Sequence, residues 1–310
     1  MASTQLQFIV SLTVSLLYTA GAVVQLLCCV AIFRHTNWST TSGLILILSL
    51  ALADLSVVFP CLLGCLSWLV GLSLPYWAAF LIGSFEAFGW LSSTLHMAAL
   101  ALNRLVAIVY TNRYDLLWSP KRTCMFFVSC HVIGFVYTCY AQVLGPTTLW
   151  NSEFGAALWC KPPSAGVLLL VSMISLGTVF ILFCCYGIVS VSVVKWRLQS
   201  QQAMGQSSVD WSLCVQFFSI TFIYVVVSLC WFCLPVLVPT AQQHYLYVIA
   251  YLVAVQSTGN GYVYLVFNAT IRQAVKKVVG IGLSNQVLLC FGCGIDRMLW
   301  HRNLNWRTGG

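Results

Sequence analysis

Long apolar stretches dominate the chain, and short polar connectors separate them. A helix needs about 20 apolar residues to cross a bilayer. Seven runs reach that length, and the only acidic or basic residues within them are Asp54 and Glu86. Lipid offers no partners to backbone N–H and C=O groups, so each run is predicted to be an α-helix. The runs are 8–33, 42–70, 78–103, 123–144, 165–194, 211–237 and 245–267.

The predicted fold class is therefore an all-α membrane protein, a bundle of seven transmembrane helices. Only 6% of the residues are charged, whereas soluble domains carry about 25%. This composition excludes a soluble globular protein, a disordered chain and a disulfide-rich secreted domain. An outer-membrane barrel is excluded as well, because its strands alternate and its lumen is polar.

The distribution of basic residues predicts the orientation in the membrane. Cytoplasmic loops collect Lys and Arg. Lys161 alone follows an even-numbered span; all the other basic residues follow odd-numbered spans, namely Arg34, Arg104, Arg113, Lys121, Arg122, Lys195, Arg197, Arg272, Lys276, Lys277, Arg297, Arg302 and Arg307. We therefore expect an extracellular N-terminus, a cytoplasmic C-terminus and a basic rim facing anionic membrane lipid. The net charge of +8 is not taken as a sign of nucleic-acid binding.

Span three carries three polar side chains on one face. Glu86 precedes Arg104 by 18 residues, which is five whole helical turns and about 27 Å. Ser93 lies close to the same line. This stripe predicts an acid near the extracellular end, a hydroxyl midway and a guanidinium at the cytoplasmic mouth.

A polar centre is predicted where spans two, three and seven meet. Asp54 in mid-span costs at least ~2.5 kcal/mol against lipid, so it should face the bundle interior. Ser257 and Asn260, beside two glycines, interrupt span seven. With Ser93, these side chains would satisfy one another. Either waters or a sodium ion, or a dry hydrogen-bond network, would fit, and both alternatives stay open.

The motifs around these residues resemble those of rhodopsin-like G-protein-coupled receptors over all seven spans. Residues 50–54 read Leu-Ala-Leu-Ala-Asp, 103–105 read Asn-Arg-Leu, and 260–264 read Asn-Gly-Tyr-Val-Tyr. The segment 267–272, Phe-Asn-Ala-Thr-Ile-Arg, is similar to the start of that family's cytoplasmic amphipathic helix. Tyr186 lies near the cytoplasmic end of span five, as the family often has it.

Within the superfamily the chain looks most similar to nematode serpentine chemoreceptors of the Srx type. This resemblance rests on the exit of span three (103–107), the following loop up to Thr123, the exit of span seven and Cys139…Trp150…Cys160. Four positions depart from the usual receptor pattern: Asn103 replaces an acid, Gly261 a proline, Gln25 an asparagine and Ala79 a bridging cysteine.

The resemblance implies a receptor domain at 1–279 and a cytoplasmic tail at 280–310, in a plasma-membrane protein. It implies a chemosensory receptor that transmits the binding of a small-molecule ligand to a heterotrimeric G protein, with no enzymatic activity and no cofactor. The ligand pocket would lie between spans three, five, six and seven. Its candidates are Glu86, Trp90, Trp231, Phe232 and Tyr251; those of the polar cluster are Gln25, Asp54, Ser93, Ser257 and Asn260; those for coupling are Asn103, Arg104, Tyr186 and Tyr264.

Several alternatives remain at this point. Glu86 occupies the place of the acid in amine receptors, so the ligand is an amine or a neutral odorant-like molecule. Cys139 and Cys160 would form a disulfide that frames the loop of Trp150, or remain reduced thiols. A transporter or channel is the alternative function, although no repeat is visible. The histidines show neither close pairing along the chain nor metal-ligand spacing, so no metal site is expected.

Overall fold

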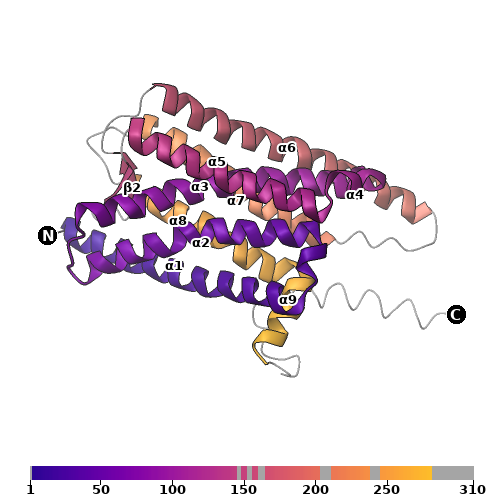
Figure 1. Cartoon of the computed structure of the whole chain (residues 1–310), viewed down its shortest axis with the longest axis horizontal. Coiled ribbons are helices and arrows are strands. Elements are labelled where there is room, and N and C mark those ends of the chain that lie inside the picture. Colours follow the sequence, from indigo (N-terminus) through magenta and orange to yellow (C-terminus); the bar gives the residue numbers. More distant parts are fainter. Residues whose placement is uncertain are drawn as a thin grey trace.

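The computed structural model describes residues 2–144, 148–151, 156–159, 165–202, 211–237 and 245–280. Its seven long helices run lengthwise in one bundle (Figure 1). The expected all-α bundle is therefore confirmed. The helices are α1 (Ala2–His35), α2 (Ser42–Leu69), α3 (Tyr76–Val109), α5 (Pro120–Leu144), α6 (Ala165–Gln202), α7 (Trp211–Leu237) and α8 (Tyr245–Phe267).

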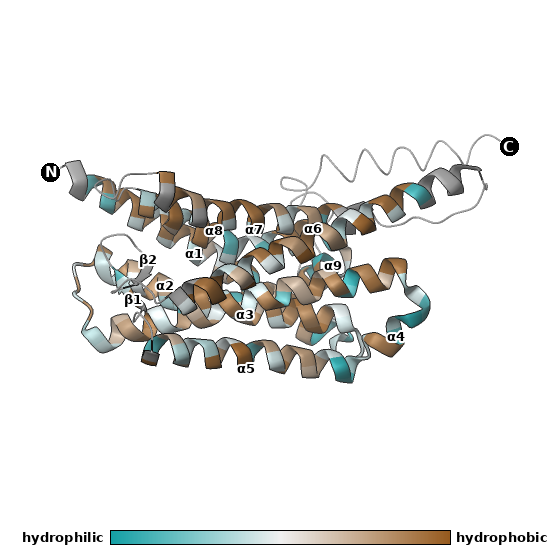
Figure 2. Ribbon diagram, turned by 90° about the horizontal axis from the view of Figure 1, so that it is seen from above, coloured by the Kyte–Doolittle hydropathy of each residue, from teal (hydrophilic) through white to brown (hydrophobic). Residues whose placement is uncertain are grey.

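Shorter elements mark the two ends of the bundle. A pair of antiparallel strands, β1 (Thr148–Asn151) and β2 (Ala156–Trp159), lies at the same end as the N-terminus (Figures 1 and 2). We call this the hairpin end. The opposite end, called the α9 end, carries α4 (Tyr114–Leu117) and α9 (Ala269–Val278), with the 3₁₀ turns η1 (Trp38–Thr40) and η2 (Thr111–Arg113).

Five helical stretches of the described residues are long and apolar enough to cross a membrane on length and composition alone: Gln5–His35, Ser42–Leu69, Tyr76–Val109, Pro120–Val143 and Leu169–Lys195. In α7 the part of the helix with described side chains includes the apolar stretch Phe218–Trp231. In α8 the polar residues 256–260 lower the hydropathy. These two helices complete the bundle. Figure 2 shows hydrophobic residues along most of its length and hydrophilic ones gathered near α4.

Close contacts between helices depend on glycines. A Cβ at Gly21 of α1 would lie 2.1 Å from Cγ2 of Thr258 on α8. A Cβ at Gly89 of α3 would lie 2.5 Å from Val57 on α2 and 2.8 Å from the carbonyl oxygen of Ala53. Small residues let membrane helices approach closely, which is where their packing energy comes from.

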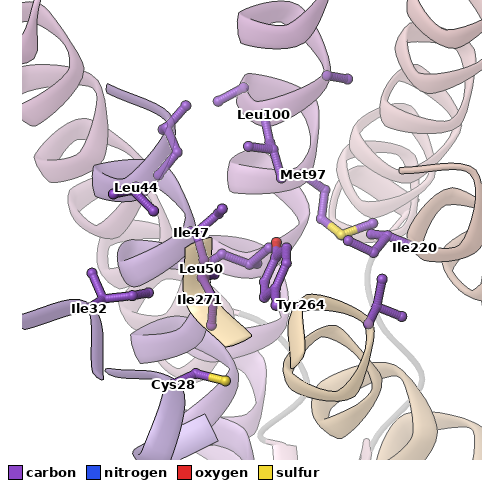
Figure 3. Packing of buried hydrophobic residues seen from close by; sticks show 14 of the residues in the cluster. Cys28, Ile32, Leu44, Ile47, Leu50, Met97, Leu100, Ile220, Tyr264 and Ile271 are labelled. Atoms are coloured by element: carbon purple, nitrogen blue, oxygen red, sulfur yellow. The ribbon is translucent and has the colours of Figure 1, made fainter. Parts of the chain in front are cut away.

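The two largest apolar clusters of the described residues lie toward opposite ends of the bundle. The cluster toward the α9 end includes Leu50, Met97, Leu100, Ile220 and Tyr264, whose packing Figure 3 shows. The cluster toward the hairpin end joins side chains of α1, α2, α3, α8 and β1: Val10, Val14, Tyr18, Ala22, Val57, Val58, Cys61, Cys65, Ile82, Trp150, Tyr247 and Ala254. Asp54, Ser93 and Asn260 lie between the two clusters along their helices, so a polar layer separates two apolar ones.

Candidate functional site

Asp54 is the centre of the polar layer. Its Oδ1 accepts a hydrogen bond from Ser93 Oγ of α3 at 2.7 Å. Its Oδ2 accepts one from Asn260 Nδ2 of α8 at 2.8 Å. All three side chains are buried. One carboxyl group thus connects α2, α3 and α8. The binding of waters or a sodium ion at this group stays a prediction.

Ser257 and Gln25 form a second contact beside this layer. The Gln25 Nε2 of α1 donates to the Ser257 carbonyl oxygen of α8. The Ser257 hydroxyl donates within its own helix, to the Val253 carbonyl at 2.8 Å, and not to Asp54. A Cβ at Gly261 would lie 2.8 Å from Gln25 Cγ, so the glycine in place of the family's proline makes room for the glutamine.

Glu86 is buried near the hairpin end of α3, with 9% of its surface exposed. Its Oε2 accepts a hydrogen bond from the Cys61 thiol of α2 at 3.4 Å. Tyr18 of α1 lies close to the same thiol. The carboxyl group therefore lies at the α1–α2 side of α3, next to the hairpin-end cluster.

The other predicted ligand residues do not all adjoin the same apolar cluster. Tyr251 of α8 faces α1, where its hydroxyl hydrogen-bonds to Thr13. Trp90, one helical turn after Glu86, packs against the cluster that includes Tyr137 of α5 and Val171 of α6. Trp231 is half-buried on α7, and the side chain of Phe232 lies outside the described ones. Glu86 and Tyr251 thus adjoin the hairpin-end cluster, whereas Trp90 does not.

Arg104 lies at the α9 end of α3, beside the start of α2. A Cβ at Gly43 would be 3.2 Å from its Nη2, so the guanidinium packs closely over the α2 backbone. Tyr114, Tyr186 and Tyr264 lie close to it. These tyrosines come from α4, α6 and α8, so Arg104 stands where three elements meet.

Asn103 occupies the position of the family's acid. Its Nδ2 donates to the Tyr114 hydroxyl at 3.3 Å, which connects α3 to α4. Tyr264 is fully buried, and its hydroxyl has no hydrogen-bond partner among the described residues. Predicted coupling residues are therefore gathered around Arg104, and Tyr114 joins them.

Two polar features of the bundle interior were not predicted from the sequence. Gln216 of α7 is buried, and neither its Nε2 nor its Oε1 has a partner among the described residues; an amide within an apolar run was the available signal. His96 of α3 and His131 of α5 pair across the helices, with ring centroids 4.8 Å apart, and both imidazoles reach the Ser49 hydroxyl. The two residues lie far apart along the chain, so their spacing gave no sign of this contact.

The predicted disulfide and the predicted tail include residues that lie outside the described ones. Cys160 lies outside the described residues, and Cys139 is exposed on α5, so the bridge stays a prediction. The tail beyond residue 280 lies outside them too. Within the described part of the chain, no group of three or more His, Cys, Asp or Glu residues is arranged to hold a metal ion.

Residues 4–287 match the family described as Serpentine type 7TM GPCR chemoreceptor Srt. The chain belongs to this family. It is a multi-pass membrane protein and a chemosensory G-protein-coupled receptor, and nothing favours the transporter or channel alternative. No curated protein matches the chain.

The match also makes one correction. The predicted resemblance to the Srx type was wrong at that level, since the receptor is of the Srt type. Short motifs at the helix exits were enough to indicate a serpentine receptor, but they did not distinguish one type from another.

Proposed function

We propose that this receptor binds a small amine at the hairpin end through Glu86 and passes the signal to a heterotrimeric G protein that docks around Arg104 at the α9 end. The observation that carries the proposal is the α3 stripe. It places a buried acid at one end, Ser93 in the polar layer and Arg104 at the other end.

The ligand chemistry follows from the surroundings of Glu86. A carboxylate inside the membrane costs at least ~2.5 kcal/mol unless it is paired or hydrated. Glu86 is buried, and one of its contacts is the Cys61 thiol, which carries no charge at neutral pH. A ligand ammonium would supply a full opposite charge and charge-assisted hydrogen bonds. An amine therefore fits this site better than a neutral molecule of the same shape.

The polar layer is the proposed link between the two ends. Asp54 holds α2, α3 and α8 through two hydrogen bonds, so movement of any one of these helices must stretch or break a bond. A ligand shifts a two-state equilibrium only by its difference in affinity for the two states. Ligand contacts near Glu86 on α3 and Tyr251 on α8 bear on two of the three helices.

The α9 end is proposed to be cytoplasmic. In the described residues this end carries Arg34, Arg113, Lys121, Arg122 and the α9 basic residues, and the positive-inside rule assigns such an end to the cytoplasm. In a plasma membrane the hairpin end then faces the exterior, where a chemosensory ligand arrives.

Responses of Glu86→Gln test the ligand assignment. The full chain is expressed in cells, and calcium or cAMP is followed while small amines and their neutral alcohol counterparts are added. Glu86→Gln should need at least about ten-fold more amine, because loss of the charge pair costs more than about 1.4 kcal/mol. Asp115→Asn, which removes an exposed carboxyl group on α4, is the matched control. Unchanged amine responses of Glu86→Gln would refute the assignment.

A further inference from the structure

The indole of Trp150 fills a slot at the hairpin end of the bundle. Trp150 belongs to β1, yet only 5% of its surface is exposed. It shares an apolar cluster with Cys61 and Cys65 of α2 and Ile82 of α3. A side chain from the strand pair therefore reaches into the space between the transmembrane helices.

Gly64 of α2 makes this slot. A Cβ at Gly64 would lie 2.3 Å from Cε2 of Trp150, 2.6 Å from Cζ2 and 2.6 Å from Nε1. No real Cβ approaches ring atoms so closely, so any other residue would push the indole out. The ring lies directly against the α2 backbone, and the slot is shaped for a flat aromatic group.

The indole occupies this slot at a cost. Its Nε1–H is buried and has no acceptor among the described residues. A buried Trp N–H normally finds a partner, and a donor without one loses its bonds to water without replacement. Trp150 thus satisfies the shape of the slot but not its own hydrogen-bonding group, so shape alone holds the indole there, and a ligand ring of similar shape could take its place.

The slot adjoins Glu86 through a shared residue. Cys61 packs in the same cluster as Trp150, and its thiol donates to the Glu86 carboxyl group. Ile82, also in the cluster, lies one helical turn from Glu86 on α3. A molecule whose ring fills the slot would therefore carry a short side chain toward the acid.

We propose that the slot over Gly64 is an aromatic subsite of the ligand pocket, which Trp150 fills until a ligand with a flat ring displaces it. The ligand class is then an arylalkylamine or a similar ring-bearing small molecule. This inference rests on the proposed function for the amine, but the ring subsite itself does not depend on Glu86.

The first experiment fills the slot in the absence of the native indole. Full-length Trp150→Ala is purified in detergent, and its thermal unfolding is measured with and without free indole. Indole should raise the unfolding temperature of Trp150→Ala by several degrees. It should leave the double variant Trp150→Ala/Gly64→Leu unchanged, because the leucine fills the slot from α2. Trp77→Ala is the matched control, since Trp77 is 65% exposed on α3.

Failure of Trp150→Ala to reach the cell surface would not end the test. Indole in the culture medium should then restore surface expression of this variant, by binding the folded state. If indole neither stabilises nor restores Trp150→Ala, the subsite does not exist and the inference is overturned.

The second experiment tests the ligand class on the unmodified receptor. Tryptamine should half-saturate the thermal shift at a concentration at least about ten-fold below that of 2-cyclohexylethylamine, whose ring is not flat. Equal potency would overturn the ring preference even if both amines bind. If Glu86→Gln leaves tryptamine unaffected while indole still stabilises Trp150→Ala, the amine assignment fails and the aromatic subsite stands.

Discussion

Substitutions of Asp54 and of its two hydrogen-bond donors should lower the free energy of unfolding of the receptor by amounts that do not add. Ser93→Ala and Asn260→Ala each delete one hydrogen bond, of 2.7 and 2.8 Å, to the same carboxyl group. Hydrogen bonds between membrane helices average about 0.6 kcal/mol and reach about 1.7. Both bonds here are short and buried, so we expect each variant to lose about 1 kcal/mol.

The variant Asp54→Ala should lose more than either donor variant. It removes both bonds and leaves two buried donors without their acceptor, which costs further free energy. In the Asp54→Ala background, however, the additional change Ser93→Ala should cost close to nothing, because its bond is already gone. The expected coupling between positions 54 and 93 is therefore at least about 0.5 kcal/mol.

Thermal unfolding of the purified receptor in one detergent measures this cycle. Basal nucleotide exchange on an added G protein, measured on the same samples, reports whether loosening the three helices changes the conformational equilibrium. Ser129→Ala is the control, because this exposed serine donates within its own helix, to the Met125 carbonyl. Strictly additive losses at positions 54 and 93 would contradict the arrangement described above.

Two further predictions concern helix packing. Gly21→Ala should destabilise the receptor by about 1–3 kcal/mol, because the new Cβ overlaps Thr258 of α8; Gly177→Ala on α6, which has open space, should unfold near the parent temperature. Gln216→Leu should raise the unfolding temperature, because an apolar side chain replaces a buried amide whose partners are missing among the described residues. A lowered unfolding temperature of Gln216→Leu would mean that the amide is satisfied after all.

Hydropathy located the transmembrane helices well but did not fix where they end. The predicted bounds of α7 and α8 agree with the structure. The last predicted residue of α6 was Val194, yet the helix continues to Gln202. The length of an apolar run reflects the thickness of the membrane and not the full length of the helix. Lys195 and the polar residues after it continue the helix beyond the lipid.

The polar contacts show the same division. The helical periodicity of α3 predicted that Glu86, Ser93 and Arg104 lie on one stripe. The cost of exposing a carboxyl group to lipid predicted that Asp54 faces the bundle interior. The partner of Ser257 did not follow, because a serine in a helix can bond to its own backbone, as it does with Val253.

The strand pair and the slot of Trp150 could not be read from the sequence. β1 and β2 have four residues each, too few for a clear alternating pattern, and both contact α3. The role of Gly64 is visible only in the structure, where the indole of Trp150 lies against it.

Ligand-evoked signalling of Arg104→Ala tests the central claim most directly. Cells expressing the parent or the variant at equal surface levels receive tryptamine and related small amines, and calcium or cAMP is recorded while binding is followed separately. The account predicts that Arg104→Ala binds the amine as the parent does but evokes no second-messenger response. A variant that still signals like the parent would show that Arg104 is not the point where binding at the hairpin end reaches the G protein.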